Sequence, residues 1–303
     1  MARLNFHHLH SFWAVAKEGH LTRAAEHLHV SQSALSIQIK QLEVQLGQAL
    51  FKRQGRVLQL SEAGAVALQY ADSIFSSGNE LMAILRDGKS QDRQVLRIGA
   101  QATLSRNFQE NFVKPLLGRD DVELMLQSGG LDELLGRLRV HSLDLILSNR
   151  RVLTTSDDPW RCRRIARQPV SLVGQPRKRK KAFQFPEDIA TMQLLLPSRN
   201  SDIRAGFDLI CEQRGVRYRV LAEVDDMALL RLLARDSQSL ALLPTVVVQD
   251  ELRTGKLEQY CVVPDLYESF YAITVQRRFD SPLLKGLLKR SEEEVLGKEL
   301  PLT

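Results

Sequence analysis

The chain has 303 residues, of which 44% are hydrophobic, and a formal net charge of +6 at pH 7. This length allows two or three domains with sizeable cores, and no stretch approaches the roughly 18 uninterrupted apolar residues that a membrane helix needs. The opening sequence MARLNFHHLHSFW has no apolar signal-peptide core, so we expect a cytoplasmic protein without a membrane partner.

The positive charge is concentrated in two stretches. Residues 1–61 contain seven Lys and Arg against three acids, and residues 161–181 contain nine Lys and Arg and no acid. A basic N-terminal segment indicates an anionic partner at that end of the chain. The run RKRKK at 177–181 belongs to the second stretch, and it suits a solvated loop better than a set of phosphate contacts.

Neither the cysteines nor the acids indicate a cofactor or a metal. Cys162, Cys211 and Cys261 are widely separated, without CxxC or Cys/His ligand spacing, so we interpret them as reduced thiols and expect no metal. Two sensing roles remain open. Neighbouring arginines favour the thiolate of Cys162, and Asp225–Asp226 could hold a cation, although acids before a helix are more often partners of the helix dipole.

The first elements in chain order form a predicted helix-turn-helix. LTRAAEHLHV at 21–30 predicts a short helix whose Ala24 and Ala25 permit close approach, and SQSALSIQIKQLEVQLG at 31–47 predicts a longer one capped by Ser31. Helical spacing puts one apolar core stripe on the longer helix: Leu35, Ile39, Leu42 and Leu46. Its opposite face carries small or polar residues and two separate apolar ones: Ser33, Ser36, Ile37, Lys40 and Val44.

This pattern is typical of a DNA reader, since small side chains at the start of the second helix let it lie deep in a major groove. LFKRQGRVLQL at 50–60 then predicts a β-wing whose two arginines reach phosphates or a minor groove. The expected DNA-binding residues are Ser31, Gln32, Ser33, Ser36, Ile37, Lys40, Arg53 and Arg56. The alternative is a helical packing module whose polar face is only solvated.

Residues 62–86 predict one long helix with a heptad stripe. Its members are Leu68, Ala71, Phe75, Gly78, Met82 and Leu85. We expect this stripe to pair two chains, because a dimer places two reading heads in successive turns of DNA. The alternative is that the stripe packs on its own domain.

From QVLRIGA at 94–100 onward, short apolar runs alternate with amphipathic segments, which predicts an α/β domain with a parallel-type sheet and helices on both faces. Most of the apolar runs end in small or polar residues. Because ligands of open α/β sheets bind beyond the carboxyl ends of strands, we expect a small-molecule site there.

The segment from Ala24 to Arg53 has the pattern AAxxLxVSQSALSxxIxxLExxLGxxLFxR, continued by LSxAG at 60–64. This pattern resembles the signature of the LysR-type transcriptional regulators. FWAVAKEG, GRVLQLSEAG, YADSIF and LAEVDDMALL most resemble the branch of that family that contains the sodium/proton antiporter activator. His20 departs from the family, which commonly has serine or a similar cap at this position of the second helix.

The resemblance implies a winged helix-turn-helix domain at 1–61, a linker and dimerisation helix at 62–89, and an effector-binding domain at 90–303. The resemblance also implies that the effector-binding domain is similar to periplasmic solute-binding folds. One subdomain would be residues 95–164 plus 267–303, and the other residues 165–266. The resemblance further implies homodimers that often pair into tetramers, and RNA polymerase as a further partner.

The resemblance also implies, position by position, which residues line a cleft between the subdomains. Their chemistry suits a small anion or polar metabolite. These residues are Ala102, Thr103, Leu104, Ser128, Gly129, Asn149, Ser198, Arg199, Asn200, Asp226 and Thr245. Ordinary helix caps and a surface arginine are the alternative interpretation of this set.

The expected function is therefore a sequence-specific DNA-binding transcription regulator controlled by a small-molecule effector. One alternative is a sensor or solute-binding protein whose helical head serves assembly. Another is an enzyme using the cleft, which the absence of a nucleophile elbow, P-loop, GxGxxG motif or metal cluster from the sequence disfavours. We expect no catalytic residue.

Overall fold

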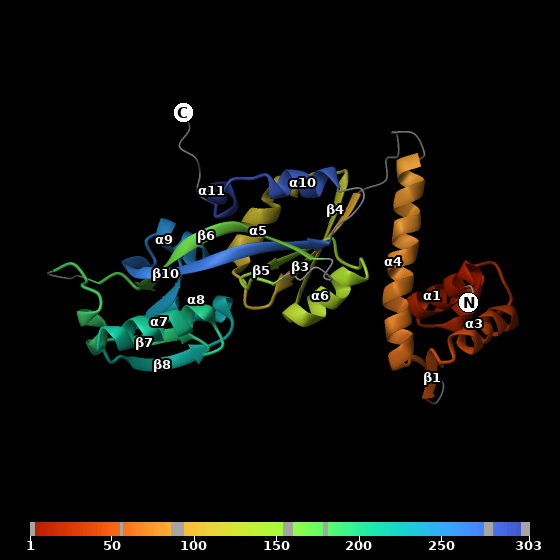
Figure 1. Ribbon diagram of the computed structural model, residues 1–303, viewed down its shortest axis with the longest axis horizontal. Coiled ribbons are helices and arrows are strands. Elements are labelled where there is room, and N and C mark those ends of the chain that lie inside the picture. The colour runs from red at the N-terminus through yellow and green to blue at the C-terminus, as the bar shows by residue number, and fades with distance from the viewer. Residues whose placement is uncertain are drawn as a thin grey trace. The chain divides into compact units, whose positions relative to one another are not determined.

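The computed structural model describes residues 4–54, 57–85, 94–153, 160–177, 181–275 and 281–297 (Figure 1). Within these ranges only the backbone is described at residues 53, 54, 57, 58, 76, 77, 79–81 and 83–85. Two compact units make up the chain, the first over Met1–Asp92 and Arg139–Ser142, and the second over Arg93–Leu138 and Leu143–Thr303. Each unit has a hydrophobic core of its own.

The first unit contains a helix-turn-helix, a β-hairpin and a long final helix. Gly19 and Gly47 end the first and third helices, because their left-handed backbones (φ 66° and 69°) are conformations that other residues rarely adopt. Ser31 begins the third helix as predicted, since its hydroxyl accepts from the Ala34 amide at 3.2 Å. The elements are α1 (Phe6–Glu18), α2 (Leu21–His27), α3 (Gln32–Leu46), β1 (Phe51–Gln54), β2 (Val57–Leu60) and α4 (Glu62–Leu85).

The predicted core stripe of α3 is confirmed over three of its four positions. Leu35, Ile39 and Leu42 are buried with residues of α1 and α2, including Phe12 and Ala24. Leu46 is 42% exposed, so its assignment to the core was wrong. It is the last helical residue before Gly47 and lines an open pocket instead.

The predicted heptad stripe of α4 packs largely on its own domain. Ala71 is fully buried, and Phe75 lies against His10 and Trp13 with ring centroids 5.1 and 5.2 Å apart. Asp72 strengthens this packing by accepting from Trp13 Nε1 at 2.6 Å and from Lys17 at 2.9 Å. Assigning the stripe as a whole to dimerisation was therefore wrong, because Ala71 has no surface left for a partner.

The other members of that stripe fall into three groups. Leu68 is partly buried against the same core, whereas Gly78 and Met82 are exposed. The side chain of Leu85 lies outside the described residues. A role in dimerisation stays a prediction for Gly78 and Met82.

The second unit is built on one eight-stranded sheet of order β4-β3-β5-β10-β6-β9-β7-β8. The pairs β3–β4, β3–β5, β7–β8 and β7–β9 are parallel, as predicted, but β10 and β6 run antiparallel to their neighbours, so the sheet is mixed. The strands are β3 (Gln94–Gln101), β4 (Val122–Gly129), β5 (Leu145–Ser148), β6 (Trp160–Gly174), β7 (Gln193–Pro197), β8 (Arg219–Val224), β9 (Leu240–Pro244) and β10 (Glu258–Val275).

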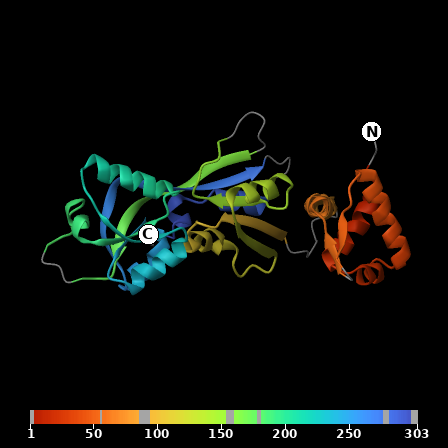
Figure 2. The same cartoon turned by 90° about the horizontal axis from the view of Figure 1, so that it is seen from below.

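The long strands β6 and β10, of 15 and 18 residues, join two smaller α/β arrangements (Figure 1). We call β3, β4 and β5 with their helices the first half, and β7, β8 and β9 with theirs the second half. In each half the two crossover connections run in opposite directions along the sheet. Because such connections are right-handed as a rule, their helices belong on opposite faces. Figure 2 shows this for α7 and α8.

The helices of the second unit cover both faces of the sheet, as predicted. They are α5 (Arg106–Val113), α6 (Leu131–Arg139), α7 (Asp202–Gln213), α8 (Met227–Asp236), α9 (Gln249–Arg253), α10 (Pro282–Leu288) and α11 (Glu292–Val295), with 3-10 turns η1 (Lys114–Leu116), η2 (Glu187–Thr191) and η3 (Thr245–Val248). In the part of the chain that the structure describes, no helix is both long and apolar enough to span a membrane.

Candidate functional site

The first candidate surface is the face of α3 opposite its core stripe. Ser33, Ser36, Ile37, Lys40 and Val44 are all exposed, and the Ile37 side chain keeps 57% of its surface. Ser31 and Gln32 are exposed at the start of the helix, where the Ser31 and Ser33 hydroxyls lie 3.0 Å apart. The burial that the sequence predicted for this helix therefore leaves the predicted DNA-binding residues in solvent.

The acid of α3, Glu43, points away from that face. Its carboxylate accepts from the backbone amides of Leu50 and Phe51 at 2.7 and 3.3 Å, which ties the helix to the start of the hairpin. A carboxylate on the reading face would repel phosphates. The exposed face of α3 is left with one cation, Lys40, and no anion.

The predicted wing is present as a two-stranded antiparallel hairpin. Its register pairs Phe51 with Leu60 and Gln54 with Val57. The backbone of Arg53 lies opposite Leu58, but the Arg53 side chain and the whole of Arg56 lie outside the described residues. The positions of the two arginine heads therefore stay predictions.

The turn of the helix-turn-helix has a feature that sequence reasoning missed. His29 has a left-handed backbone, φ 54°, and the amide of Val30 closes the turn by donating to the Ala25 carbonyl at 3.0 Å. As expected from the departure at His20, that side chain makes no capping hydrogen bond to α2. The turn is held by backbone bonds and by the Ser31 cap.

The second candidate site lies where β3, β4 and β5 end. Thr103, just after β3, donates to Asn149 Oδ1 at 3.4 Å just after β5. The Ala102 amide donates to the Gly129 carbonyl at 3.1 Å, and Arg106 donates to the Ser128 hydroxyl at 3.0 Å. The structure thus brings together five of the predicted effector residues: Ala102, Thr103, Ser128, Gly129 and Asn149.

Leu104 does not belong to that group. It is buried in the hydrophobic core of the second unit, where it packs with the α5 side chains Phe108 and Phe112. Its assignment to the effector site was wrong, because the turn after β3 exposes Ala102, leaves Thr103 half-buried and turns Leu104 inward. The spacing of apolar residues predicts the buried face of a helix or strand, but it does not predict which residue of a loop turns inward.

The predicted residues of the second half occupy turns that follow β7, β8 and β9. The Ser198 amide donates to the Val224 carbonyl at 3.0 Å, and Thr245 begins η3. Asp226 caps α8 by accepting from the Ala228 amide at 2.8 Å, which supports its interpretation as a helix cap. Asn200 is exposed, and the Arg199 side chain, 80% exposed, pairs with Glu223 at 3.4 Å.

Glu268, in the middle of β10, is a site residue that sequence reasoning missed. Its side chain accepts from Asn149 Nδ2 at 2.9 Å, so a chain of contacts runs from Thr103 through Asn149 to Glu268. Burial raises the pKa of Glu268 to about 7; the Asn149 hydrogen bond opposes this shift, and the Asp202 carboxylate adds to it. The available signal was that Glu268 is the one charged residue in LYESFYAITV, residues 266–275.

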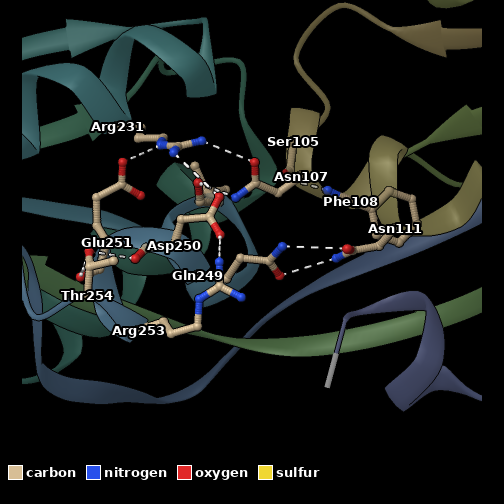
Figure 3. Close-up of polar contacts among 11 residues, drawn as sticks. Ser105, Asn107, Phe108, Asn111, Arg231, Gln249, Asp250, Glu251, Arg253 and Thr254 are labelled. Carbon is tan, nitrogen blue, oxygen red and sulfur yellow. Dashed lines mark hydrogen bonds and ion pairs between the residues drawn. The ribbon is translucent and has the colours of Figure 1, made fainter. Parts of the chain in front are cut away.

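Arg231 organises a second polar cluster between the two halves (Figure 3). It donates from Nε to Glu251 at 2.8 Å, and from Nη1 to Asn107 of α5 at 3.1 Å. Asn111 on α5 also donates to Gln249 at 3.2 Å. Glu251 Oε2 is buried without a hydrogen-bond partner among the described residues, so Arg231 is the main compensation for that charge.

Two family models match the chain. The model described as LysR substrate binding domain matches residues 89–295, and the model described as Bacterial regulatory helix-turn-helix protein, lysR family, matches residues 6–65.

The chain belongs to the LysR family. As a LysR regulator it is a DNA-binding transcription regulator with a C-terminal effector-binding domain, and it is not an enzyme. The predicted family, fold class and general function are confirmed.

Several known proteins match this LysR regulator over nearly its whole length. The transcriptional activator protein NhaR of Escherichia coli (strain K12) is 27% identical over 289 residues, which is 95% of each chain. A full-length OxyR variant from Pseudomonas aeruginosa covers 97% of this chain and 95% of its own, with 21% identity and a TM-score of 0.64. Vibrio fischeri DarR, solved in complex with DNA, covers 98% and 100%, with 20% identity and a TM-score of 0.51.

Proposed function

We propose that this LysR regulator binds a specific operator as a dimer and that a small molecule bound where β3 and β5 end controls it. The observation that carries the first part is the exposed face of α3, with small hydroxyls, the two apolar side chains Ile37 and Val44, and one cation. Ser33 and Ser36 leave room for the helix backbone to approach base edges. Ile37 suits contact with a thymine methyl, and Lys40 suits a phosphate.

Replacing Lys40 with alanine is expected to weaken binding to operator and to unrelated DNA by a similar factor. The physical reason is that a lysine–phosphate contact releases counterions without reading sequence. For a dimer that loses one such contact per protomer, the slope of log K against log salt should fall in magnitude by about 2. Fluorescence anisotropy with labelled duplexes over a salt series measures both quantities.

The matched control is Lys114→Ala, which removes an exposed lysine from the effector-binding domain. Its salt slope should equal that of the unmodified protein. An unchanged slope for Lys40→Ala would remove Lys40 from the DNA interface.

The dimer in this proposal uses an apolar surface of the first unit. An open pocket of about 790 Å³ lies between the end of α3 and the first turns of α4. The exposed side chains of Val66 and Tyr70 border it, together with Leu46, Ala49 and Ile74. A second copy of the chain is the proposed occupant, because a LysR regulator that reads two half-sites needs two heads.

Tyr70→Glu is expected to raise the dissociation constant of the dimer on the order of tenfold or more, because it puts a charge into an apolar contact. Sedimentation velocity over a concentration series measures this. Ile37→Glu is the control: it places the same charge on α3, away from the pocket, so it should impair DNA binding and leave the dimer intact. Equal dissociation constants for both variants would refute the pocket as the interface.

The same proposal includes the finer organisation that the family implies. The linker and dimerisation segment is residues 62–89, and the two subdomains divide where β6 and β10 cross from one half to the other. Pairing of dimers into tetramers and contact with RNA polymerase complete the mechanism, in a cytoplasmic setting. Mass photometry of the regulator on operator DNA distinguishes dimers from tetramers.

A further inference from the structure

The candidate effector site contains a carboxylate that the protein does not neutralise. The Glu268 side chain is only 5% exposed, and its one hydrogen bond from a described residue comes from Asn149 to Oε1. No described residue donates to its other oxygen. Burying a carboxylate without compensation is unfavourable, so this position is suited to a group that the protein does not itself provide.

The charged groups around Glu268 do not supply that compensation. Asp202, in the first turn of α7, lies close enough to disfavour the ionised form of Glu268. None of the described Lys, Arg or His side chains forms an ion pair with Glu268, and Arg167, on the neighbouring strand β6, lies over the Tyr267 ring instead. Glu268 therefore has an unfavourable carboxylate neighbour and no ion-pair partner among the described residues.

We propose that the effector of this regulator is a small organic cation whose ammonium group binds the carboxylate of Glu268. This inference rests on the proposed effector site. It replaces the anion that the sequence suggested, because the arginine expected to bind an anion, Arg199, is exposed and paired with Glu223. Thr103 and Asn149 provide an additional hydroxyl and amide for hydrogen bonds to the same ligand.

An organic ammonium fits this chemistry better than a metal ion. Within the described ranges no group of three His, Cys, Asp or Glu side chains is arranged to hold a metal. An ammonium needs only two or three acceptors, and its charge is favoured by Glu268 of β10 and by Asp202 of α7 together. Such a ligand favours the conformations in which the two halves hold these carboxylates close together.

The test uses the full chain at about pH 8, where Glu268 is ionised, and three probes with the same four-carbon backbone. The probes are 1,4-diaminobutane, 1,4-butanediol and succinate, each at up to about 10 mM against KCl of matched ionic strength. Isothermal titration and thermal melting should detect binding of the diamine and neither of the other two. Glu268→Gln should weaken diamine binding roughly tenfold or more, because a charge-assisted contact is lost.

The control Glu110→Gln removes an exposed acid from α5 and should leave diamine binding unchanged. Binding of succinate in place of the diamine, no diamine binding, or full diamine binding by Glu268→Gln each overturns the inference. Thr103→Val distinguishes a failure of this inference from a failure of the proposed effector site. If that variant loses succinate binding, the site stands and the cation is wrong; if it alters binding of no probe, the site itself is refuted.

A proton on Glu268 is the other source of positive charge at this position. Operator binding measured without any probe at about pH 6 and pH 8 distinguishes protonation of Glu268 from binding of an organic cation. A diamine effector predicts that the diamine changes operator affinity at pH 8 and that Glu268→Gln does not respond. Operator affinity that changes with pH in a Glu268-dependent way but not with the diamine would overturn the inference in favour of the proton.

Discussion

Replacing Arg231 with methionine is expected to lower the free energy of unfolding of the effector-binding domain by about 3–5 kcal/mol. Methionine keeps most of the apolar stem but removes the guanidinium that pairs with Glu251 at 2.8 Å. The Glu251 side chain is buried and one of its oxygens already lacks a hydrogen bond among the described residues. Asn107 of α5 would also lose its contact with α8. Equilibrium unfolding in urea, followed by far-UV circular dichroism, measures the change.

Two further variants decide whether the buried charge causes that loss. Arg235→Met lies one turn along α8 and removes an exposed ion pair with Asp236, so it should leave the free energy of unfolding almost unchanged. Arg231→Met combined with Glu251→Leu removes both charges and should recover most of the lost stability. A double variant no more stable than the single one would show that Arg231 acts by packing alone.

The DNA-binding unit was predictable because its signals are local. The Ser31 cap, the spacing of Leu35, Ile39 and Leu42, and the hairpin after Leu50 each depend on residues a few positions apart. The spacing on α4 correctly identified Leu68, Ala71 and Phe75 as a packing stripe, whereas Gly78 and Met82 are exposed. Its spacing did not reveal whether a partner or the same chain would cover it, and the contacts of Phe75 with His10 and Trp13 answer that question.

The effector-binding unit was predictable in its parts and not in its assembly. Alternating strands and helices indicated a parallel-type sheet, and only the family resemblance implied two subdomains. The strands β6 and β10 pair antiparallel across about a hundred residues of sequence. No local pattern reports such a pairing. The same limit explains the site: Thr103 and Asn149 follow strands and were found, whereas Glu268 joins them only because β10 lies beside β5.

Stability of the effector-binding domain is expected to fall as the pH rises from about 4.5 to 7, through the titration of Glu268. The pKa of Glu268 is raised in the folded protein to about 7 from an ordinary value of 4.5, so the folded state holds a proton that the unfolded state has released. The stabilisation is complete below the unfolded pKa and is lost as the pH approaches the folded one. At about 1.4 kcal/mol per pKa unit, the change over this interval is about 3 kcal/mol.

Glu268→Gln isolates this effect, because glutamine stays neutral at every pH and can still bond to Asn149. The difference in unfolding free energy between the original protein and Glu268→Gln should therefore shift by about 3 kcal/mol in favour of the glutamine variant between about pH 4.5 and 8. Asp202→Asn should reduce the shift, since Asp202 contributes to the raised pKa. Parallel pH profiles for the original protein and Glu268→Gln would mean that solvent reaches the carboxylate, and a bound cation should flatten the original profile above pH 7.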